Sequence, residues 1–391
     1  MIKTYKVMLI PNNKQQTKMI QTAGCARFAY NWAVAYEQQN YESGGKFLSD
    51  IDLRRIFTEV KHQEEYTWLN SVSNDALKQS IKDACLAYKR FFWGNANYPR
   101  FKSKRCAKPS FYVDTDKIEI SETHVKLEKI ADAKRRNRVK ANWVRLAEHG
   151  RIPTNVKYSN PRVTFDGLHW WLSVGVDVPD SEDISTDQGI GIDLGVKDLA
   201  VCSDGHTYKN INKSRKMKKL VRKKRRLQRK VSKKYQNNRK GECYVKTRNI
   251  MKSEKQLLRV SRKLTNIRHN HIHQTTSEIV SRKPKFIVLE DLNVSGMMKN
   301  RHLAKAIQEQ GFYEFRRQME YKCAWSNIQL IIADRFYPSS KTCSCCGAVK
   351  RDLSLRDRVF ICPECGFTID RDLQAAINLA KYGEQQINNV A

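Results

Sequence analysis

Three acidic residues in the second half of the chain could act together on a metal ion. Asp193 interrupts the strand-like run IGIDL, Glu290 ends the apolar run FIVLE, and Asp372 lies at the start of the helical pattern DRDLQAAINLAKY. A buried carboxylate without a partner is costly, so an acid on such a strand either faces water or meets a cation. Carboxylate oxygens suit Mg²⁺, and two such ions about 4 Å apart can activate water in phosphodiester cleavage. We therefore predict a two-magnesium site at these acids, although each acid taken alone is more often a solvated strand end or a helix cap.

Four cysteines have the spacing of a second metal site. Cys343 and Cys346 form one C-x-x-C pair, and Cys362 and Cys365 form another, with fifteen residues between the pairs. Two such pairs are typical of a four-thiolate zinc site, and four free thiols would have this spacing only by chance. We predict one structural Zn²⁺, because four protein ligands leave no open position for a substrate. Cys345, which lies between two ligands, is expected to stay outside the site.

The charge of the chain indicates a polyanionic partner. Its 391 residues carry 73 Lys and Arg against 40 Asp and Glu, and the formal net charge of +33 far exceeds what solubility requires. Nucleic acid is the usual partner of so basic a protein. The densest run, KSRKMKKLVRKKRRLQRKVSKK, keeps a helical apolar stripe and would contact phosphates, which does not distinguish RNA from DNA. In this run we predict contacts at Lys223, Lys224, Arg225 and Arg226.

A second basic segment, YKRFFWGNANYPRFKSKR, mixes positive and aromatic side chains. We predict that its positive residues contact phosphate, namely Arg100, Lys102, Lys104 and Arg105. Its aromatic residues Phe91, Phe92 and Trp93 are predicted to belong to the core instead.

Signals for membranes or secretion are weak. The opening MIKTYKVMLIPNN has an apolar stretch too short for a signal peptide and lacks a small-residue cleavage site. A run of about 18 apolar residues, which a spanning helix would need, is missing from the sequence. We therefore expect a cytoplasmic, nucleoid-associated protein that does not contact membranes and whose eleven cysteines form no disulfide framework.

The first block of elements combines one strand, a helical segment and several short strands. A strand is predicted at 2–10 and helices at 15–39, 50–60 and 74–93. Short strand-like runs follow, and Asp166-Gly167 is a strong hairpin signal between two of them. We predict a small β-barrel unit into which the helical block is inserted.

The second block has an α/β pattern and follows a polar linker at 178–188. Two long helices follow the strand that carries Asp193, and the second of them is predicted to reach Ser281. Buried strands at 285–292 and 328–337 and a final helix at 370–382 complete the pattern. Elements of this kind pack into one sheet-and-helix layer, which would bring the three acids together.

The chain resembles TnpB, the family of insertion-sequence-encoded, RNA-guided DNA nucleases related to the type V CRISPR effectors. The resemblance is carried by GIDLGVKDLAV, IVLEDLNVSGMMKNR, FYPSSKTCSCCG, CPECG and DRDLQAAINLA, which occur in the order typical of that family. CARFAYNWA and YPRFKSKR in the first half agree with it as well, so the resemblance covers nearly the whole chain.

The resemblance implies a multidomain α+β architecture. It places a wedge β-barrel domain at 1–12 and 98–180, with a helical recognition domain inserted at 13–97. It implies an RNase H-like (RuvC-type) α/β nuclease domain at 181–338 and 370–384, which includes a basic helical hairpin at 211–281. An inserted zinc ribbon would occupy 339–369.

The resemblance also implies roles for single residues and partners. Asp193, Glu290 and Asp372 align with the three catalytic, magnesium-binding acids, and the four cysteines of the C-x-x-C pairs align with the zinc ligands. Lys78 and Gln79 fall where the recognition helix reads a short motif beside the target. The family uses a guide RNA from the transposon end and cleaves double-stranded DNA that pairs with it, leaving a 5′-phosphate. We expect a monomer in this complex.

Two departures from the family pattern and two rival functions accompany this interpretation. The C-terminal tail is shorter than in many relatives, and the second departure is at Gln374. Gln374 stands where the family usually has Asn, which displaces an amide by one methylene. An inserted HNH-type nuclease segment is missing from the sequence, so one site would cut both strands in turn. The rivals are a three-acid transposase that needs no RNA, and a non-catalytic RNA-guided repressor, which loss of an acid would indicate; all three acids are present here.

Overall fold

The computed structural model describes residues 1–130, 141–179, 186–241, 243–354 and 357–388. The chain divides into two compact units, Met1–Pro179 and Asp180–Ala391, and each unit has its own buried apolar cores. Of the predicted linker at 178–188, residues 180–185 lie outside the described residues. Among the described helices, none is both long enough and apolar enough to span a membrane.

The first unit is built on an open antiparallel sheet of seven strands. The strands are β1 (Ile2–Ile10), β2 (Ser110–Tyr112), β3 (Glu119–Ile120), β4 (His124–Lys126), β5 (Trp143–Leu146), β6 (Tyr158–Phe165) and β7 (Trp170–Asp177). Their order in the sheet is β2-β6-β7-β1-β5-β4-β3, so the predicted first strand lies at the centre. Within the described residues, no pairing joins the edge strands β2 and β3, and the predicted closed barrel is not found.

The hairpin between β6 and β7 confirms the predicted Asp166-Gly167 turn. The Oδ1 atom of Asp166 accepts hydrogen bonds from the backbone amides of Leu168 and His169, both at 2.8 Å. Gly167 has a φ of 91°, a conformation that glycine adopts without steric cost.

Four helical segments follow β1: α1 (Asn13–Glu42), α2 (Asp50–His62), the 3-10 helix η1 (Glu64–Ser71) and α3 (Asn74–Phe92). They confirm the predicted helices at 15–39, 50–60 and 74–93. A capping box starts α1, in which the side chains of Asn12 and Gln15 each accept a hydrogen bond at 2.9 Å from the backbone amide of the other residue.

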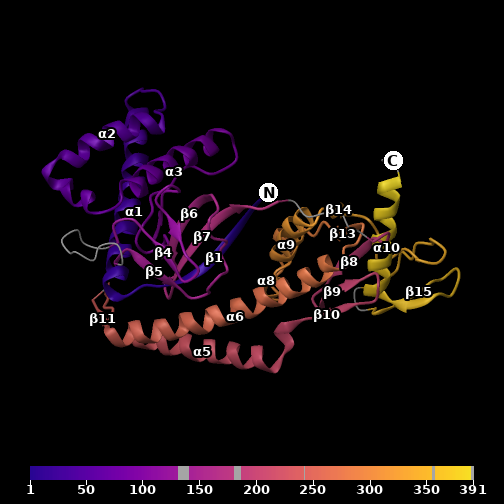
Figure 1. The fold of residues 1–391 in the computed structure, drawn as a ribbon. Coiled ribbons are helices and arrows are strands. Elements are labelled where there is room, and N and C mark those ends of the chain that lie inside the picture. Colours follow the sequence, from indigo (N-terminus) through magenta and orange to yellow (C-terminus); the bar gives the residue numbers. More distant parts are fainter. Residues whose placement is uncertain (131–140, 180–185, 242, 355–356, 389–391) are drawn as a thin grey trace. The chain divides into compact units, whose positions relative to one another are not determined.

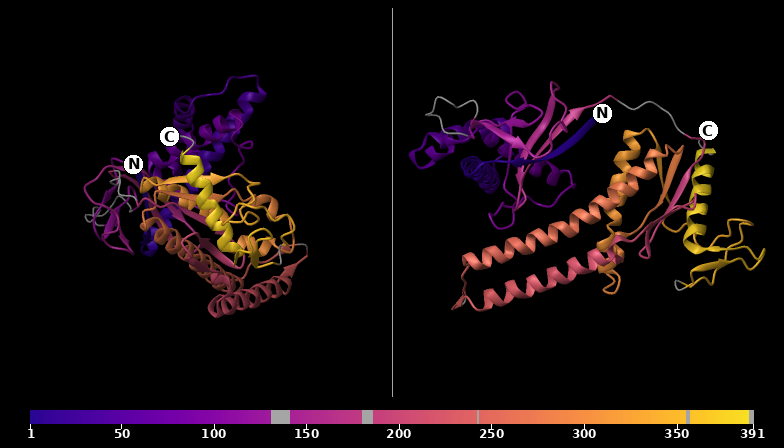
Figure 2. Two further views of the ribbon diagram at one scale, coloured as in Figure 1. Left: turned by 90° about the vertical axis from the view of Figure 1, so that its right-hand side faces the viewer. Right: turned by 60° about the horizontal axis from the view of Figure 1, so that its bottom comes forward.

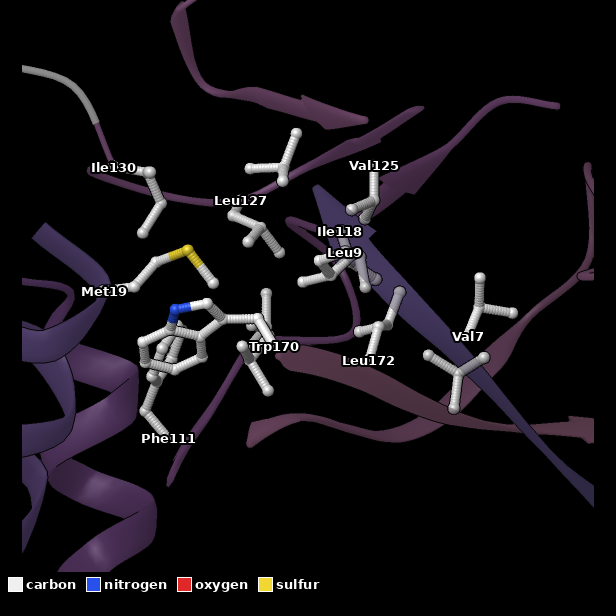
Figure 3. Close-up of a cluster of buried hydrophobic side chains, with 14 of the residues drawn as sticks. Val7, Leu9, Met19, Phe111, Ile118, Val125, Leu127, Ile130, Trp170 and Leu172 are labelled. Carbon is white, nitrogen blue, oxygen red and sulfur yellow. The ribbon is translucent and has the colours of Figure 1, made fainter. Parts of the chain in front are cut away.

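The core of the first unit lies where α1 meets the sheet. Figure 3 shows Met19 of α1 beside Trp170 and Phe111, with Leu127 and Leu172 further along the same cluster. Trp170 is only 2% exposed, so a single large ring closes the space between the helix and the sheet.

The prediction that Phe91, Phe92 and Trp93 belong to the core is wrong, because these side chains are 37%, 58% and 68% exposed. Leu77, Ile81 and Tyr88 form the buried stripe of α3, and Phe91 and Phe92 continue its spacing. The helix ends at Phe92, however, so the continued stripe lies beyond the packed part of the helix and faces solvent.

The second unit contains a mixed five-stranded sheet. Its strands are β8 (Ile190–Leu194), β9 (Asp198–Cys202), β10 (Thr207–Lys209), β13 (Phe286–Glu290) and β14 (Gln329–Ala333), in the order β10-β9-β8-β13-β14. The last three strands of this order run parallel to one another, β9 pairs antiparallel with β8, and β10 pairs antiparallel with β9. This arrangement confirms the predicted strands around Asp193, Glu290 and residues 328–337.

Helices cover both faces of this sheet (Figure 1). On one face lies α10 (Arg371–Asn388), whose Leu379 packs on Phe286 and Val288. On the other face lie α6 (Arg248–Ser281), α8 (Ala304–Gln310) and α9 (Phe312–Trp325). The short helix α7 (Val294–Met297) precedes α8 in the chain. Both faces of β8 and β13 are therefore covered, which explains the continuous apolar runs in their sequences.

The predicted pair of long helices is confirmed by α5 (Arg215–Gln236) and α6, which lie side by side and antiparallel in Figure 2. A tyrosine at the far end of α5 links the two, since Tyr235 Oη donates a hydrogen bond to Glu254 Oε1 at 2.7 Å. The second helix ends at Ser281, as the sequence predicts, and its last turns pack on the sheet through Ile272 and Ile279.

Candidate metal centres

Glycines allow α10 to lie directly on the strands that carry the acids. A Cβ atom on Gly191 would stand 2.1 Å from the carbonyl oxygen of Ala376 and 2.4 Å from the amide nitrogen of Ala380. A Cβ atom on Gly383 would stand 2.3 Å from the ring of Phe286. Both contacts exclude any side chain, so these two glycines set the distance between helix and sheet.

The pairing of β8 with β13 places two of the acids at the same end of the sheet. Ile192 pairs with Leu289 in parallel register, so Asp193 and Glu290 occupy the next step. Side chains alternate along a strand, and Asp193 therefore shares the face of Gly191, against which α10 lies.

The direction of α10 brings the third acid to that end. The helix starts near the carboxyl ends of the strands and runs back along them, since Ala376 meets Gly191 whereas Gly383 meets Phe286 at the start of β13. Asp372 lies in its first turn and therefore approaches Asp193 and Glu290.

The three carboxylates interact electrostatically. Burial raises the pKa of Asp193 well above its usual range, and the charges of Glu290 and Asp372 raise it further. Burial also raises the pKa of Glu290, although a hydrogen bond from Ser339 and the charge of Arg371 oppose this shift. An acid group of this kind is destabilised when ionised and would be stabilised by a bound cation.

The residues present fit Mg²⁺ in ligand chemistry, since three carboxylates supply hard oxygen ligands. The acids are spaced more loosely than the cysteines. Among the described residues, the four cysteines are the only group of three or more His, Cys, Asp or Glu side chains whose ligand atoms lie close enough together to hold one metal ion.

The four cysteines form a compact cluster whose sulfur atoms all lie within 4.8 Å of one another. The Sγ atoms of Cys343 and Cys365 are 3.7 Å apart, and those of Cys346 and Cys362 are 3.5 Å apart. A tetrahedral zinc ion with Zn–S bonds of about 2.3 Å requires sulfur separations of about 3.8 Å. The cluster therefore fits Zn²⁺, and Cys345 is exposed outside it, as the sequence predicts.

Tight turns aim these sulfur atoms inward. The amide of Gly347 donates to the carbonyl of Cys343 at 3.0 Å, and that of Gly366 donates to the carbonyl of Cys362 at 3.2 Å. Both glycines have a positive φ, of 79° and 70°. Backbone amides, that of Cys365 first, lower the pKa of the Cys362 thiol to about 7, which favours the thiolate that a metal requires.

A polar seam joins the cysteine cluster to the acids. Asn378 of α10 donates to the carbonyls of Ser339 and Thr342 at 2.7 and 2.6 Å. The hydroxyl of Ser339 in turn donates to Glu290 Oε1 at 2.6 Å. Sequence reasoning missed Ser339, and the only signal for it was its place in the segment SSKTC that leads to the first cysteine.

Gln374 belongs to the same seam. Its side chain is fully buried, its amide donates to the carbonyl of Thr342, and its Oε1 accepts from the hydroxyl of Ser344 at 2.8 Å. In this chain the longer amide therefore contacts the segment around the first cysteine pair. The acid Asp372 lies on α10, two residues before it.

The predicted phosphate contacts on α5 lie on an open helical surface. Lys223, Arg225 and Arg226 are exposed and Lys224 is half-buried. Met217 is the only buried residue of this 22-residue helix, which contains no acidic residue.

The predicted contacts of the first unit differ among themselves. Arg100, Lys104 and Arg105 are exposed. Lys102, by contrast, is half-buried, with its Nζ atom 3.4 Å from the centroid of the Tyr30 ring, and burial lowers its pKa. Lys102 is therefore already engaged by an aromatic ring.

Lys78 and Gln79 lie on α3 and already have partners. Lys78 pairs with Asp75 at 3.6 Å, and Gln79 donates to Asp83 Oδ1 at 2.9 Å. Arg162 donates two further hydrogen bonds to Asp83, from Nη1 to Oδ2 at 2.7 Å and from Nη2 to Oδ1 at 2.9 Å. These bonds fix the carboxylate that Gln79 contacts.

Three family models match the chain. The first, described as a helix-turn-helix domain, matches residues 1–46, which here include β1 and the whole of α1. The second, of IS605 OrfB and described as "Probable transposase", matches residues 173–301. The third, described as a Cas12f1-like TNB domain, matches residues 312–379, which include the cysteine cluster.

Curated relatives match over nearly the whole chain. A protein of Streptomyces pristinaespiralis named "Putative RNA-guided DNA endonuclease" is 30% identical over 97% of this chain and 89% of that protein. InsQ of Escherichia coli (strain K12), which has the same descriptive name, is 30% identical over 98% of this chain and 92% of its own length. TnpB-like protein L79 of Acanthamoeba polyphaga mimivirus is 29% identical over 32% of this chain and 25% of that protein. The chain belongs to the TnpB family.

A solved structure shows a similar fold. The protein in the cryo-EM structure of a Cas12f1–sgRNA–target DNA complex matches with a TM-score of 0.61 and 14% sequence identity, over 97% of this chain and 98% of that chain. The fold is thus a mixed α/β multidomain fold like that of this effector.

Proposed function

We propose that this protein is an RNA-guided, metal-dependent DNA endonuclease of an insertion sequence. In this proposal it cleaves double-stranded DNA that is complementary to its guide and lies beside a short adjacent motif. The observation that carries the proposal is the approach of Asp193, Glu290 and Asp372 to one end of the β8–β13 sheet. Burial raises the pKa of Asp193 there, and the charges of the other two acids raise it further. The names of the two relatives at 30% identity support the same activity.

The domain roles form part of this proposal. The sheet order β10-β9-β8-β13-β14, with three antiparallel strands followed by two parallel ones, supports an RNase H-like nuclease domain at 181–338 and 370–384. The compact sulfur cluster supports a zinc ribbon at 339–369. Residues 1–12 and 98–180 would form the wedge domain, and 13–97 the recognition domain.

In the catalytic site, Asp193, Glu290 and Asp372 would hold Mg²⁺, which supplies an activated water and neutralises charge at the phosphate. Ser339 would orient Glu290 through its hydrogen bond, so that one carboxylate oxygen is fixed and the other remains available. Cleavage by such a site would leave a 5′-phosphate, and a single site would cut the two strands in turn.

The basic surfaces would hold the nucleic acids. The exposed side chains of α5 would neutralise the backbone of a guide RNA taken from the transposon end, through contacts that do not depend on sequence. Lys78 and Gln79 would lie near the adjacent motif. The complex would contain one copy of the chain and act in the cytoplasm on nucleoid DNA.

The test is cleavage by the purified complex. The chain should be produced together with its transposon end, the co-purified RNA sequenced, and a plasmid that carries the matching target beside a randomised motif supplied with Mg²⁺. We expect cleavage that EDTA abolishes, and a loss of about 1,000-fold or more in Asp193→Ala, since metal catalysis contributes several kcal/mol. Asp204→Ala is the matched control, because Asp204 follows β9 at the opposite end of the sheet.

Full cleavage by Asp193→Ala would contradict the site assignment. RNA binding by the same variant is the control for folding, since a variant that has lost RNA binding has lost its fold. The family model described as "Probable transposase" over residues 173–301 supports a second function, strand transfer without RNA. Activity of a preparation freed of all RNA would favour that function.

A further inference from the structure

Exposed aromatic residues gather around the end of α3, where Trp93 directly follows Phe92 in the chain. We call Phe47, Phe91, Phe92, Trp93 and Tyr98 the aromatic surface; each of them is between 37% and 68% exposed. Ring contacts connect four of them, with centroid distances of 5.6 Å for Phe47–Phe92, 5.6 Å for Phe91–Phe92 and 5.3 Å for Phe91–Tyr98.

The aromatic surface rests on a rigid support. Tyr88 beneath it is 4% exposed, lies 6.2 Å from Phe92 and 5.6 Å from Tyr98 between ring centroids, and donates to the carbonyl of Val34 at 3.1 Å. Trp93 is the C-cap of α3, and its amide bonds to the carbonyl of Lys89 at 3.0 Å. The rings are therefore presented by ordered backbone, which lowers the entropy lost on binding.

The charge around the aromatic surface has one sign. Residues 84–113 contain seven Lys and Arg and no Asp or Glu. Six of the seven are exposed, namely Lys89, Arg90, Arg100, Lys104, Arg105 and Lys108. An apolar protein partner would need no such charge, whereas a nucleic-acid strand offers apolar bases and a negative backbone at the same time.

We propose that the aromatic surface binds unpaired nucleobases of a single nucleic-acid strand, with Trp93 and Phe92 as stacking rings and the neighbouring positive side chains on the backbone. This inference rests on the proposed function only in assuming that the chain binds nucleic acid. Aromatic rings stack on any base, so the site selects single strands over duplexes without reading sequence.

The test separates bases from backbone. The full chain, freed of nucleic acid at high salt, is titrated with three fluorescent strands of about 16 nucleotides, a length that exceeds most single-strand sites. One strand is oligodeoxythymidine, one is oligouridine, and one carries abasic positions with the same number of phosphates. Anisotropy gives the three affinities, and the two base-bearing strands show whether the surface prefers DNA or RNA.

We expect Trp93→Ala to lower the affinity for the two base-bearing strands by about 5-fold or more and to leave the affinity for the abasic strand unchanged. Trp93→Phe keeps a ring and should retain most of the affinity. Arg100→Ala should lower the affinity for all three strands alike, because it removes only a contact with the phosphate backbone. Trp68→Ala is the matched control: it removes another exposed tryptophan of the same unit, whose neighbours Glu64 and Glu65 are acidic.

The inference is overturned if wild-type protein binds the abasic strand as tightly as the others, or if Trp93→Ala weakens all strands equally. A protein partner or a second copy of the chain would then be the better occupant. If Trp93→Ala binds as wild type while guided cleavage persists, the inference fails and the proposed function stands. If the wild-type chain binds none of the strands and cleaves no DNA, both fail.

Discussion

The two candidate metal centres of the second unit are assembled in different ways. The four thiols come from two short turns within 23 residues, Cys343 to Cys365, and their sulfur atoms already lie at zinc-binding separations. The three acids come from β8, β13 and α10, which are separated by about a hundred and about eighty residues of chain. They are brought to one end of the sheet but are less tightly gathered than the sulfur atoms. Like charges in a site of low dielectric repel one another until a cation binds.

The comparison teaches that the two candidate centres differ in what it costs to gather their ligands before a metal binds. Thiols of the cysteine cluster can be neutral until a metal arrives, so the protein gathers them at little cost. Asp193 and Glu290 are buried on the strands, so their ionised forms are destabilised until a cation compensates them. The seam through Ser339 and Asn378 connects the two centres.

We expect the largest effect, on zinc content and local folding, from removing the cysteine cluster. Cys362→Ser combined with Cys365→Ser should remove bound zinc and unfold the hairpin of β15 (Val359–Ile361) and β16 (Thr368–Asp370), because structural zinc supplies folding free energy of about 10 kcal/mol in small domains. Metal analysis and hydrogen exchange of residues 339–369 measure this. Retention of one zinc per chain would show that the cluster has been misassigned.

The polar seam predicts a smaller effect, in which a substitution near the cysteine cluster changes the Mg²⁺ dependence of the acids. Ser339→Ala should lower Mg²⁺-dependent cleavage by about 10- to 100-fold, the usual cost of removing a group that orients a metal ligand, while zinc content stays unchanged. A shift of the Mg²⁺ concentration needed for half-maximal cleavage distinguishes orientation of Glu290 from general damage. Ser344→Ala, which removes the hydroxyl bonded to Gln374, is the matched control and should leave that concentration nearly unchanged.

A third prediction concerns pH and the acids alone. The folded-state pKa of Asp193 lies above its unfolded value, so the folded, metal-free protein binds more protons and its stability should fall as pH rises from about 4 through the raised pKa. Asp193→Asn should remove this loss and stabilise the metal-free protein by about 1–3 kcal/mol at neutral pH. Thermal unfolding with EDTA measures both; a metal-free wild type that gains stability over that pH range would contradict the prediction.

The smallest effect is expected at the cysteine that the cluster leaves out. Cys345→Ser should leave zinc content and cleavage unchanged and should change the free energy of unfolding by less than about 0.5 kcal/mol. The reason is that this side chain is exposed and lies outside the sulfur cluster. Loss of zinc in this variant would mean that Cys345 exchanges with a ligand, and the comparison of the two centres would need revision.

Sequence patterns predicted the local features of the fold well. The first three helices, the Asp166-Gly167 hairpin and the C-x-x-C pairs each depend on residues within a few positions of one another, so their signals survive in any tertiary context. The burial of side chains at the end of an element was predicted less well. Phe91 and Phe92 keep the spacing of a buried stripe, and only the end of α3 decides that they face solvent.

The sequence by itself determined the ligand types, the turns at the C-x-x-C pairs and the order of strands and helices. These features follow from secondary-structure propensity, residue spacing and hydrophobic pattern, which are local properties of the chain. Tertiary structure alone decided that Gly191 and Gly383 admit α10 against the sheet, that Ser339 reaches Glu290, and that Lys102 lies on Tyr30. Each of these contacts joins residues far apart in the chain. Their free energy depends on a distance that no local pattern encodes.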